Sequence, residues 1–149
     1  MNRRHSGALI SGLVALLPLA FGIPATPPPP PGAPFAVIAY YGGRGRGLED
    51  LPAGKLTHII YSFLHLRGDS LSLDGPRDSA AIAALVSLKR KNPQLKVMLS
   101  LGGWGGCAPC SETFESPHGR SIFAASTLRV LARTGTDGID IDWEYPVVE

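Results

Sequence analysis

The sequence of 149 residues predicts an α/β fold in which helices cover a mainly parallel sheet. Two observations support this prediction. Short runs rich in Val, Ile, Leu, Tyr and Phe alternate with longer runs whose apolar residues recur at helical spacing. The short runs are apolar at nearly every position, which is typical of strands that are buried on both faces. The expected order is strand, loop, strand, helix, strand, helix, strand.

Residues 1–25 precede this fold and are predicted to form a signal peptide. The basic stretch "NRRH" comes before an apolar run at residues 8–23, and small residues follow, which is the order found in secretory signals. The apolar run is shorter than the ~20 residues of a membrane-spanning helix, and Pro18 interrupts it. We therefore expect a secreted or periplasmic protein without stable membrane insertion after cleavage. An uncleaved N-terminal anchor is the alternative.

A proline-rich linker, "TPPPPPGAP", follows at residues 26–34, and it should be extended because proline lacks the N–H group of helices and sheets. The folded domain is then expected over residues 35–149. Of the 14 Lys and Arg residues, Arg3 and Arg4 lie in the signal peptide, which leaves 12 against 12 Asp and Glu. This balance predicts no surface for nucleic acid or for an anionic membrane.

Four strands and two helices are expected within this domain. The strands are predicted at residues 35–41, 57–66, 95–104 and 137–143, and the helices at 76–92 and 119–135. Gly135 is the expected C-cap of the second helix. The first connection, "GGRGRGLEDLPAGK", is too rich in Gly and Pro for a good helix, and its glycines match no nucleotide-binding spacing. Four such strands fit either a small open sheet or the first half of a larger one.

The last strand carries acids at alternate positions. In "DGIDIDWEY", Asp140, Asp142 and Glu144 recur at every second residue, so their carboxylates should share one face, about 6–7 Å apart. Like charges at this spacing resist full ionisation, which prepares a carboxylic acid to act as a general acid. A solvated face, a calcium loop and an ion-pair cluster with Arg133 are the alternatives. Asp137 lies on the other parity and is expected to be structural.

Two motifs resemble those of a known family. "DGIDIDWEYP" resembles the D-x-x-D-x-D-x-E signature of family-18 glycoside hydrolases, the chitinases, and "LSLGGW" resembles the S-x-G-G motif of the same family. "AYYGG" and "THIIYSF" are similar to its first and second strands, so the resemblance extends over nearly everything from Phe35 onward. It implies a (β/α)8 TIM barrel, of which about the first four β/α units are present, with the site at the C-terminal ends of the strands. We expect such a half barrel alone to fold poorly and to lack appreciable activity.

The resemblance also implies a chemistry. A chitinase of this family cleaves β-1,4-linked N-acetylglucosamine polymers by a retaining, substrate-assisted mechanism. Glu144 would protonate the glycosidic oxygen, Asp142 would orient the substrate's acetamido group, and Asp140 would share a proton with Asp142. The implied partner is chitin or a chitooligosaccharide, and neither a cofactor, a metal nor a protein partner is indicated.

Aromatic residues and glycines at motif positions are expected to bind the sugar. The resemblance implies six such residues: Tyr40, Phe63, Gly102, Gly103, Trp104 and Tyr145. The aromatic rings would stack on the apolar faces of pyranose rings, and the glycines would let the backbone approach the substrate. Tyr40 and Phe63 have ordinary packing in the barrel core as their alternative.

The stretch "WGGCAPC" supports a second hypothesis. A C-x-x-C pattern with an internal proline, after a strand and before a helix, is how thioredoxin-like oxidoreductases present their thiols. In an exported protein with two cysteines we expect instead a local disulfide between Cys107 and Cys110. Two thiols do not fill a tetrahedral zinc site, and no histidine spacing completes one. His58 and His65 are expected to be structural.

Three alternatives to a chitinase remain open from the sequence. They are a chitin-binding, lectin-like protein on the same fold, an endo-acting hydrolase on N-glycans or peptidoglycan, and, more remotely, a thiol-disulfide oxidoreductase. The presence of Glu144 favours a hydrolase, because lectin-like relatives typically lose the acid. "WEYP" favours a chitinase among the hydrolases. The sequence does not distinguish endo from exo action.

Overall fold

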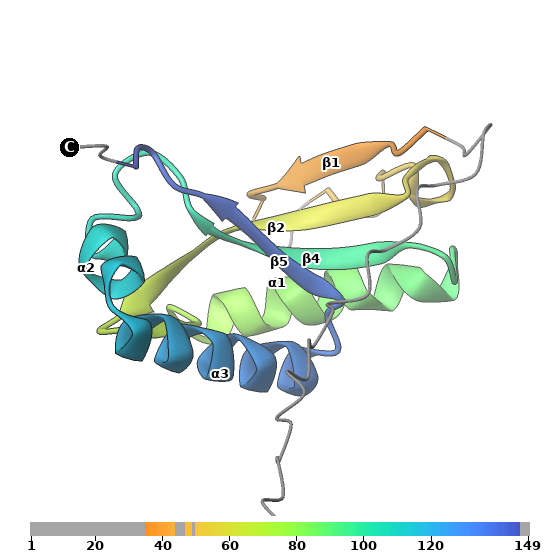
Figure 1. Cartoon of the computed structure of the whole chain (residues 1–149). Helices are drawn as coiled ribbons and strands as arrows, with labels where there is room; N and C mark the ends of the chain where they lie inside the picture. The colour runs from red at the N-terminus through yellow and green to blue at the C-terminus, as the bar shows by residue number, and fades with distance from the viewer. Residues whose placement is uncertain (1–34, 44–46, 49, 147–149) are drawn as a thin grey trace, which may run out of the picture. The chain divides into compact units, whose positions relative to one another are not determined.

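The domain is built on a parallel sheet, which a computed structural model describes over residues 35–43, 47–48 and 50–146. Its strands follow the order β1 (Ile38–Tyr41), β2 (His58–Arg67), β4 (Lys96–Gly102) and β5 (Gly138–Asp142). Figure 1 shows these four strands side by side. The four predicted strands are therefore present and parallel. The predicted signal peptide and linker lie outside the described residues.

A fifth strand was not predicted from the sequence. Strand β3 (Ser70–Ser72) pairs antiparallel with the end of β2, and Gly68, with a φ of 56°, lies in the turn between them. The run of three residues is too short to show a period-two pattern. The "GD" pair at the turn was the available signal, since Gly-Asp between two strand-like runs is typical of a two-residue hairpin.

Two long helices follow the second and third strands of the parallel sheet. Helix α1 (Pro76–Ser87) continues into the short 3-10 helix η2 (Leu88–Arg90), and α3 (Pro117–Thr134) precedes β5. The Ser116 hydroxyl accepts a hydrogen bond from the Gly119 N–H at 2.9 Å, which caps the start of α3. Gly135, with a φ of 72°, ends it as predicted. The short helices η1 (Ala53–Lys55) and α2 (Cys110–Glu115) were not expected.

The hydrophobic core lies between the sheet and these helices, and Figure 1 shows α1 and α3 on the same side of the strands. Its central members come from β2, β4, α1 and α3: Ile59, Val97, Leu99, Leu101, Ile82, Leu85, Phe123 and Val130. Each fully buried aliphatic side chain contributes about 1.5–3 kcal/mol relative to an exposed one. This packing fixes one face of the sheet, and side chains of the opposite parity, Ser100 and Asp140 among them, lie on the other face.

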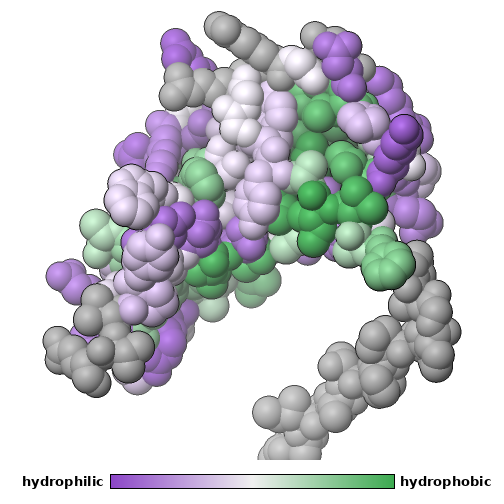
Figure 2. All heavy atoms as spheres, turned by 90° about the horizontal axis from the view of Figure 1, so that it is seen from above, coloured by the Kyte–Doolittle hydropathy of each residue, from purple (hydrophilic) through white to green (hydrophobic). Residues whose placement is uncertain are grey.

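The sheet has two open edges within the described residues, one along β1 and one along β5. Large hydrophobic side chains remain exposed on or beside these edges, including Val37, Ile38 and Ile141. Figure 2, which looks onto the structure from above, shows hydrophobic side chains gathered in an exposed patch. Unpaired strand edges of this kind invite further pairing. No helix among the described residues is long and apolar enough to cross a membrane.

Candidate active site

Asp140 lies at the centre of a hydrogen-bonded group on the face of the sheet opposite the helices. The β4–β5 register places Ser100 beside Asp140 and Gly102 beside Asp142. The Ser100 hydroxyl donates to Asp140 Oδ2 at 2.7 Å, and the Tyr40 hydroxyl donates to the same oxygen at 3.2 Å. Three strand spacings of about 4.8 Å separate β1 from β5 in a flat sheet. The Tyr40 bond therefore requires a sheet that curls toward this face.

Tyr40 is part of this group rather than of the barrel core. Burial, together with the charge and the hydrogen bond of Asp140, raises the pKa of the Tyr40 hydroxyl above its ordinary value. The side chain is nevertheless largely exposed on the open face. It can therefore support the carboxylate and contact a ligand on the same face.

Asp142 and Glu144 follow Asp140 at the C-terminal end of β5. The alternating pattern suggested that all three acids lie on one strand. Asp142 is the last residue of β5, however, so Glu144 lies just beyond the strand. The negative charge of Glu144 and its hydrogen bond with the Tyr145 hydroxyl raise the pKa of Tyr145. The Glu144 carboxylate is thus paired with an exposed aromatic residue.

Trp104 and Tyr145 form an exposed aromatic pair next to Glu144. Their ring centroids are 6.3 Å apart in an edge-to-face arrangement, and the two residues are 84% and 68% exposed. Edge-to-face geometry is a favourable arrangement for two aromatic rings. Two large aromatic side chains in solvent beside a carboxylate provide a surface on which a sugar ring can stack.

Gly102 and Gly103 connect the end of β4 to this pair. Their φ angles are 115° and 79°, in the region that favours glycine. A Cβ atom on Gly102 would overlap the Asp142 carbonyl, and one on Gly103 would lie 2.7 Å from the Phe63 ring. The Gly103 N–H also donates to the Asp142 carbonyl at 2.9 Å. A Cβ at these positions would therefore meet β5 and Phe63, and the approach of this backbone to a substrate stays a prediction.

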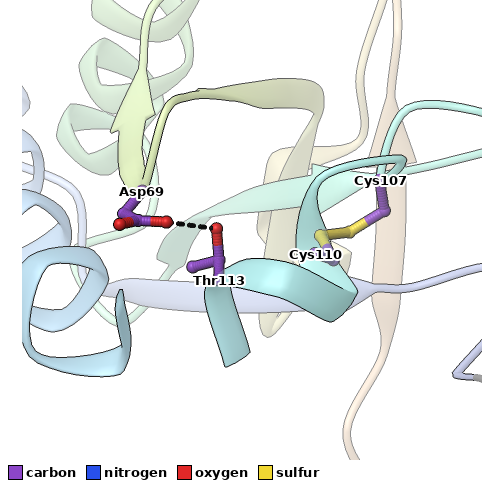
Figure 3. The surroundings of a disulfide bond; sticks show 4 residues. All are labelled: Asp69, Cys107, Cys110 and Thr113. Atoms are coloured by element: carbon purple, nitrogen blue, oxygen red, sulfur yellow. Dashed lines mark hydrogen bonds between the residues drawn. A yellow bond between two sulfur atoms is a disulfide. The ribbon is translucent and has the colours of Figure 1, made fainter. Parts of the chain in front are cut away.

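The loop after Trp104 is closed by a disulfide between Cys107 and Cys110 (Figure 3). Both cysteines are buried, and they account for every cysteine in the sequence. Beside them the Thr113 hydroxyl donates to Asp69 Oδ1 at 2.8 Å, which ties α2 to the turn between β2 and β3. Buried sulfurs are poorly placed for thiol exchange, so this geometry disfavours the oxidoreductase hypothesis.

Asp137 lies at the other end of β5 and has a structural role, as its parity suggested. Its Oδ2 atom accepts the Val97 N–H and lies 2.7 Å from Lys89 Nζ, while Lys96 Nζ is 4.0 Å from Oδ1. Burial raises the pKa of Asp137, but the hydrogen bonds and the two lysine charges outweigh it and hold the pKa below its ordinary value. Arg133, which the sequence offered as an ion-pair partner for the alternating acids of the last strand, forms no ion pair among the residues that the structure describes.

One polar residue of the site, Ser100, was not singled out from the sequence. Ser100 is the serine of the S-x-G-G motif, and the motif itself was the signal that could have identified it. His65 lies 2.5 Å from Asp74 through its Nδ1 atom, next to the loop that precedes α1. Nδ1 of His58 lies 2.9 Å from the Thr57 hydroxyl oxygen at the start of β2, which agrees with a structural residue. In the described part of the chain, no group of three His, Cys, Asp or Glu residues is arranged to hold a metal ion.

Comparison with known proteins decides the family. The profile described as "Glycosyl hydrolases family 18" matches residues 36–149. This chain belongs to glycosyl hydrolase family 18. The resemblance read from the sequence motifs is thereby confirmed.

Family-18 relatives share both sequence and structure with the chain. Chitinase 1 of Aphanocladium album is 35% identical over 139 residues, which cover 77% of this chain and 33% of that protein. A group IV chitinase of Ostrinia furnacalis superposes with a TM-score of 0.67 at 28% identity, covering 75% of this chain and 34% of that one. A class V chitinase from Nicotiana tobaccum in complex with NAG4 gives a TM-score of 0.66 at 27% identity, over 74% and 33%.

These comparisons confirm the predicted fold class. The parallel strands and their covering helices correspond to (β/α) units of the family-18 TIM barrel. The chain spans about a third of the length of the family-18 proteins it matches. Asp140, Asp142 and Glu144 lie at the C-terminal end of β5, which is the end of a barrel strand where active sites are built.

Proposed function

We propose that this family-18 chain carries the catalytic acids of a secreted, chitinase-like glycoside hydrolase. The observation that supports the proposal is the group around Asp140, in which Ser100 and Tyr40 hold the carboxylate in place on β5. Asp142 follows on the same parity, and Glu144 lies next to the exposed pair of Trp104 and Tyr145. Positioned acids beside an aromatic surface are what glycosidic cleavage requires.

In the proposed reaction, Glu144 donates its proton to the glycosidic oxygen, and the bond from that oxygen to the anomeric carbon breaks. The carbonyl oxygen of the substrate's own acetamido group attacks the anomeric carbon and forms an oxazolinium intermediate. Water then opens this ring and returns a proton to Glu144, so the configuration is retained. This substrate-assisted course is the family's exception to the usual two-carboxylate mechanism.

The neighbouring acids position the reacting groups in this scheme. Asp142 accepts a hydrogen bond from the acetamido N–H and turns the carbonyl oxygen toward the anomeric carbon. Asp140 accepts hydrogen bonds from Ser100 and Tyr40, so it is held in a fixed place beside Asp142. Such orientation lowers the entropic cost of bringing reacting groups together.

We expect the 149-residue chain by itself to show no appreciable hydrolysis. The three acids lie on or just beyond β5, which is an outer strand of the described sheet and leaves them open to water on one side. A general acid works best in a site that excludes water and surrounds the substrate with fixed dipoles. A complete site therefore needs further protein beyond β5 that covers the acids on this open side.

A hybrid barrel tests the proposal. Residues 36–149 are joined to the remaining part of Chitinase 1 of Aphanocladium album, and hydrolysis of a soluble N-acetylglucosamine tetramer is followed by product separation. We expect cleavage by the hybrid and a loss of about 100-fold or more in Glu144→Gln. The matched control is Glu115→Gln, which alters an exposed acid on α2.

Two outcomes would contradict the assignment. A folded hybrid with the same rate in Glu144→Gln as in the parent would exclude Glu144 as the acid. A folded hybrid that binds the tetramer without cleaving it would favour the lectin-like alternative. Hydrolysis by the 149-residue chain alone, dependent on Glu144, would overturn only the expectation that this chain is inactive.

A further inference from the structure

Helix α2 contacts the end of β5 through an aromatic pair. The ring centroids of Phe114 on α2 and Trp143 are 5.5 Å apart, and Trp143 is the residue between Asp142 and Glu144. Both aromatic side chains are partly buried and pack against the hydrophobic core. The short segment that carries two of the three acids is therefore supported from the side of α2.

Phe114 is also held on the side of α3. Its ring centroid lies 5.0 Å from that of Phe123 in an edge-to-face arrangement, and Phe123 is a buried core residue. Ring pairs at these distances attract one another beyond the gain from burial alone. Phe114 therefore connects the core to Trp143, so a shift of the Phe114 ring should shift the segment on which Glu144 lies.

Two anchors fix α2 itself, and Figure 3 shows both of them. The disulfide joins Cys110, the first residue of the helix, to Cys107 in the loop after β4, and the Thr113 hydroxyl donates to Asp69 Oδ1 at 2.8 Å. Cys110 and Thr113 are fully buried. A helix of six residues is not stable by itself in water, so the position of α2 depends on such anchors.

The loop closed by the disulfide makes a second contact with β5. The Gly103 N–H donates to the Asp142 carbonyl at 2.9 Å, and the Gly106 N–H donates to the Gly103 carbonyl at 2.9 Å. A Cβ atom on Gly102 would lie 3.6 Å from the Cβ atom of Cys107, so this turn packs against the disulfide. The disulfide therefore supports the turn that holds the Asp142 carbonyl.

We propose that α2 and the Cys107–Cys110 disulfide position Asp142 and Glu144, and that Phe114 is the positioning residue for Glu144. Glu144 lies beyond the last residue of β5, so strand pairing does not fix it, and Phe114 does so through Trp143. A displacement of about 1 Å can lower a rate about 100-fold. The effect on catalysis rests on the proposed function, whereas the placement of Glu144 by Phe114 does not.

Alkaline titration of Tyr145 in the 149-residue chain tests this placement without any enzymatic activity. The charge and the hydrogen bond of Glu144 raise the pKa of Tyr145, so this pKa reports whether Glu144 stays beside it. In Phe114→Ala the pKa should return toward 10.0, and in Phe114→Leu it should lie between that value and the parent's. Each curve is corrected with the same variant carrying Tyr145→Phe, and near-ultraviolet circular dichroism checks folding.

Leu131→Ala is the matched control. Leu131 is another partly buried side chain that packs against the core, but it lies near the end of α3 that leads to the start of β5, away from Glu144. Its truncation should lower stability and leave the Tyr145 titration at the parent's curve.

Kinetics of the hybrid barrel supply a second measurement. Phe114→Ala should lower kcat for the N-acetylglucosamine tetramer about tenfold or more and change KM by less than about twofold, because the acid moves while the stacking residues remain. Phe114→Leu should lose less of kcat. Leu131→Ala should leave kcat of the folded enzyme at the parent's value, since a loss of stability alone does not move Glu144.

The disulfide is tested in the same hybrid by Cys107→Ser combined with Cys110→Ser. This change nearly preserves the size of both side chains and frees the start of α2 from the loop after β4. We expect a lower kcat, as in Phe114→Ala, together with a higher KM, because the freed loop also carries Trp104. The parent's kcat in the folded double variant would overturn the role of the disulfide.

The other outcomes separate the positioning role from the proposed function. Parent-like titration and kcat in Phe114→Ala, or in Phe114→Leu where the alanine variant does not fold, would overturn the positioning role. Equal changes in Phe114→Ala and Leu131→Ala would also overturn it, because they would reflect general loosening. If Glu144→Gln hydrolyses normally while Phe114→Ala still shifts the Tyr145 titration, the proposed function fails and the placement of Glu144 stands. If Glu144 is essential and Phe114→Ala keeps the parent's kcat, only the positioning role fails.

Discussion

The Ser100 hydroxyl donates a hydrogen bond to Asp140 over 2.7 Å, and this bond links β4 to β5 at the level of the acids. Ser100 is fully buried, so its hydroxyl has no access to water as an alternative partner. The serine of the "LSLGGW" motif thereby acts on the adjacent "DGIDIDWEY" motif. The two motifs that identify the family in sequence are one hydrogen-bonded unit in the structure.

Ser100→Ala tests this unit. The Asp140 carboxylate loses one of its two hydroxyl donors, and we expect a loss of about 1–3 kcal/mol in the free energy of unfolding, measured by urea denaturation. Ser79→Ala is the control, because Ser79 lies exposed on α1 and should change stability by less than about 0.5 kcal/mol. Equal stability of Ser100→Ala and the parent would show that the bond does not hold the strands together.

Local patterns in the sequence predicted much of this arrangement. The period-two spacing of Asp140 and Asp142 indicated a shared face, and the bond from Ser100 to Asp140 agrees with it. The helix before β5 and its C-cap at Gly135 were also predictable, because caps depend on a few neighbouring residues. These features need only short-range information.

Features that depend on distant parts of the chain were not predictable in this way. Tyr40 and Asp140 are 100 positions apart, and their bond exists only because the sheet curls. Asp137 pairs with Lys89 of η2 and Lys96 of β4, which the fold of the chain brings near β5. Sequence proximity therefore indicated neither lysine as a partner of Asp137, although its structural role was expected.

Gly102→Ala should be strongly destabilising. Alanine at a φ of 115° is strained, and its Cβ atom would overlap the Asp142 carbonyl, so β4 and β5 would have to separate. We expect a loss of at least about 3 kcal/mol in the free energy of unfolding. Gly54→Ala is the matched control, since Gly54 has open space and an ordinary φ. A denaturation midpoint equal to the parent's in Gly102→Ala would contradict the close approach of the two strands.

Asp137→Asn should make stability depend less on pH. The pKa of Asp137 in the folded protein lies below the ordinary value of 3.8, so its carboxylate stabilises the fold fully above that value. This contribution is lost as the pH falls through the lower folded pKa. Since a quarter of the side chain is exposed, we expect a loss of about 1 kcal/mol or less at neutral pH.

Urea denaturation at several pH values measures this effect. The stability difference between the parent and Asp137→Asn should be largest at neutral pH and should close in strong acid. Asp50→Asn, at an exposed turn, is the control and should show no such trend. A difference that stays constant down to strong acid would mean that Asp137 acts through packing and not through its charge.

Glu144→Gln should lower the pKa of Tyr145. The charge of Glu144 is the main cause of the raised Tyr145 pKa, followed by the hydrogen bond between them, so removal of the charge should bring this pKa back toward 10.0. The smaller effect of the Asp142 charge should remain. Because Tyr145 is exposed, high salt should screen the Glu144 charge and reduce the difference between parent and variant.

The ultraviolet absorbance of ionised tyrosine, titrated in alkali, measures this pKa after subtraction of the curve of Tyr145→Phe. Glu115→Gln, which removes an exposed charge on α2, should leave the Tyr145 titration unchanged. Identical Tyr145 curves in the parent and in Glu144→Gln would place the two side chains apart. The acid would then lack its aromatic neighbour, and a sugar stacked on Trp104 and Tyr145 would not bring its glycosidic oxygen to Glu144.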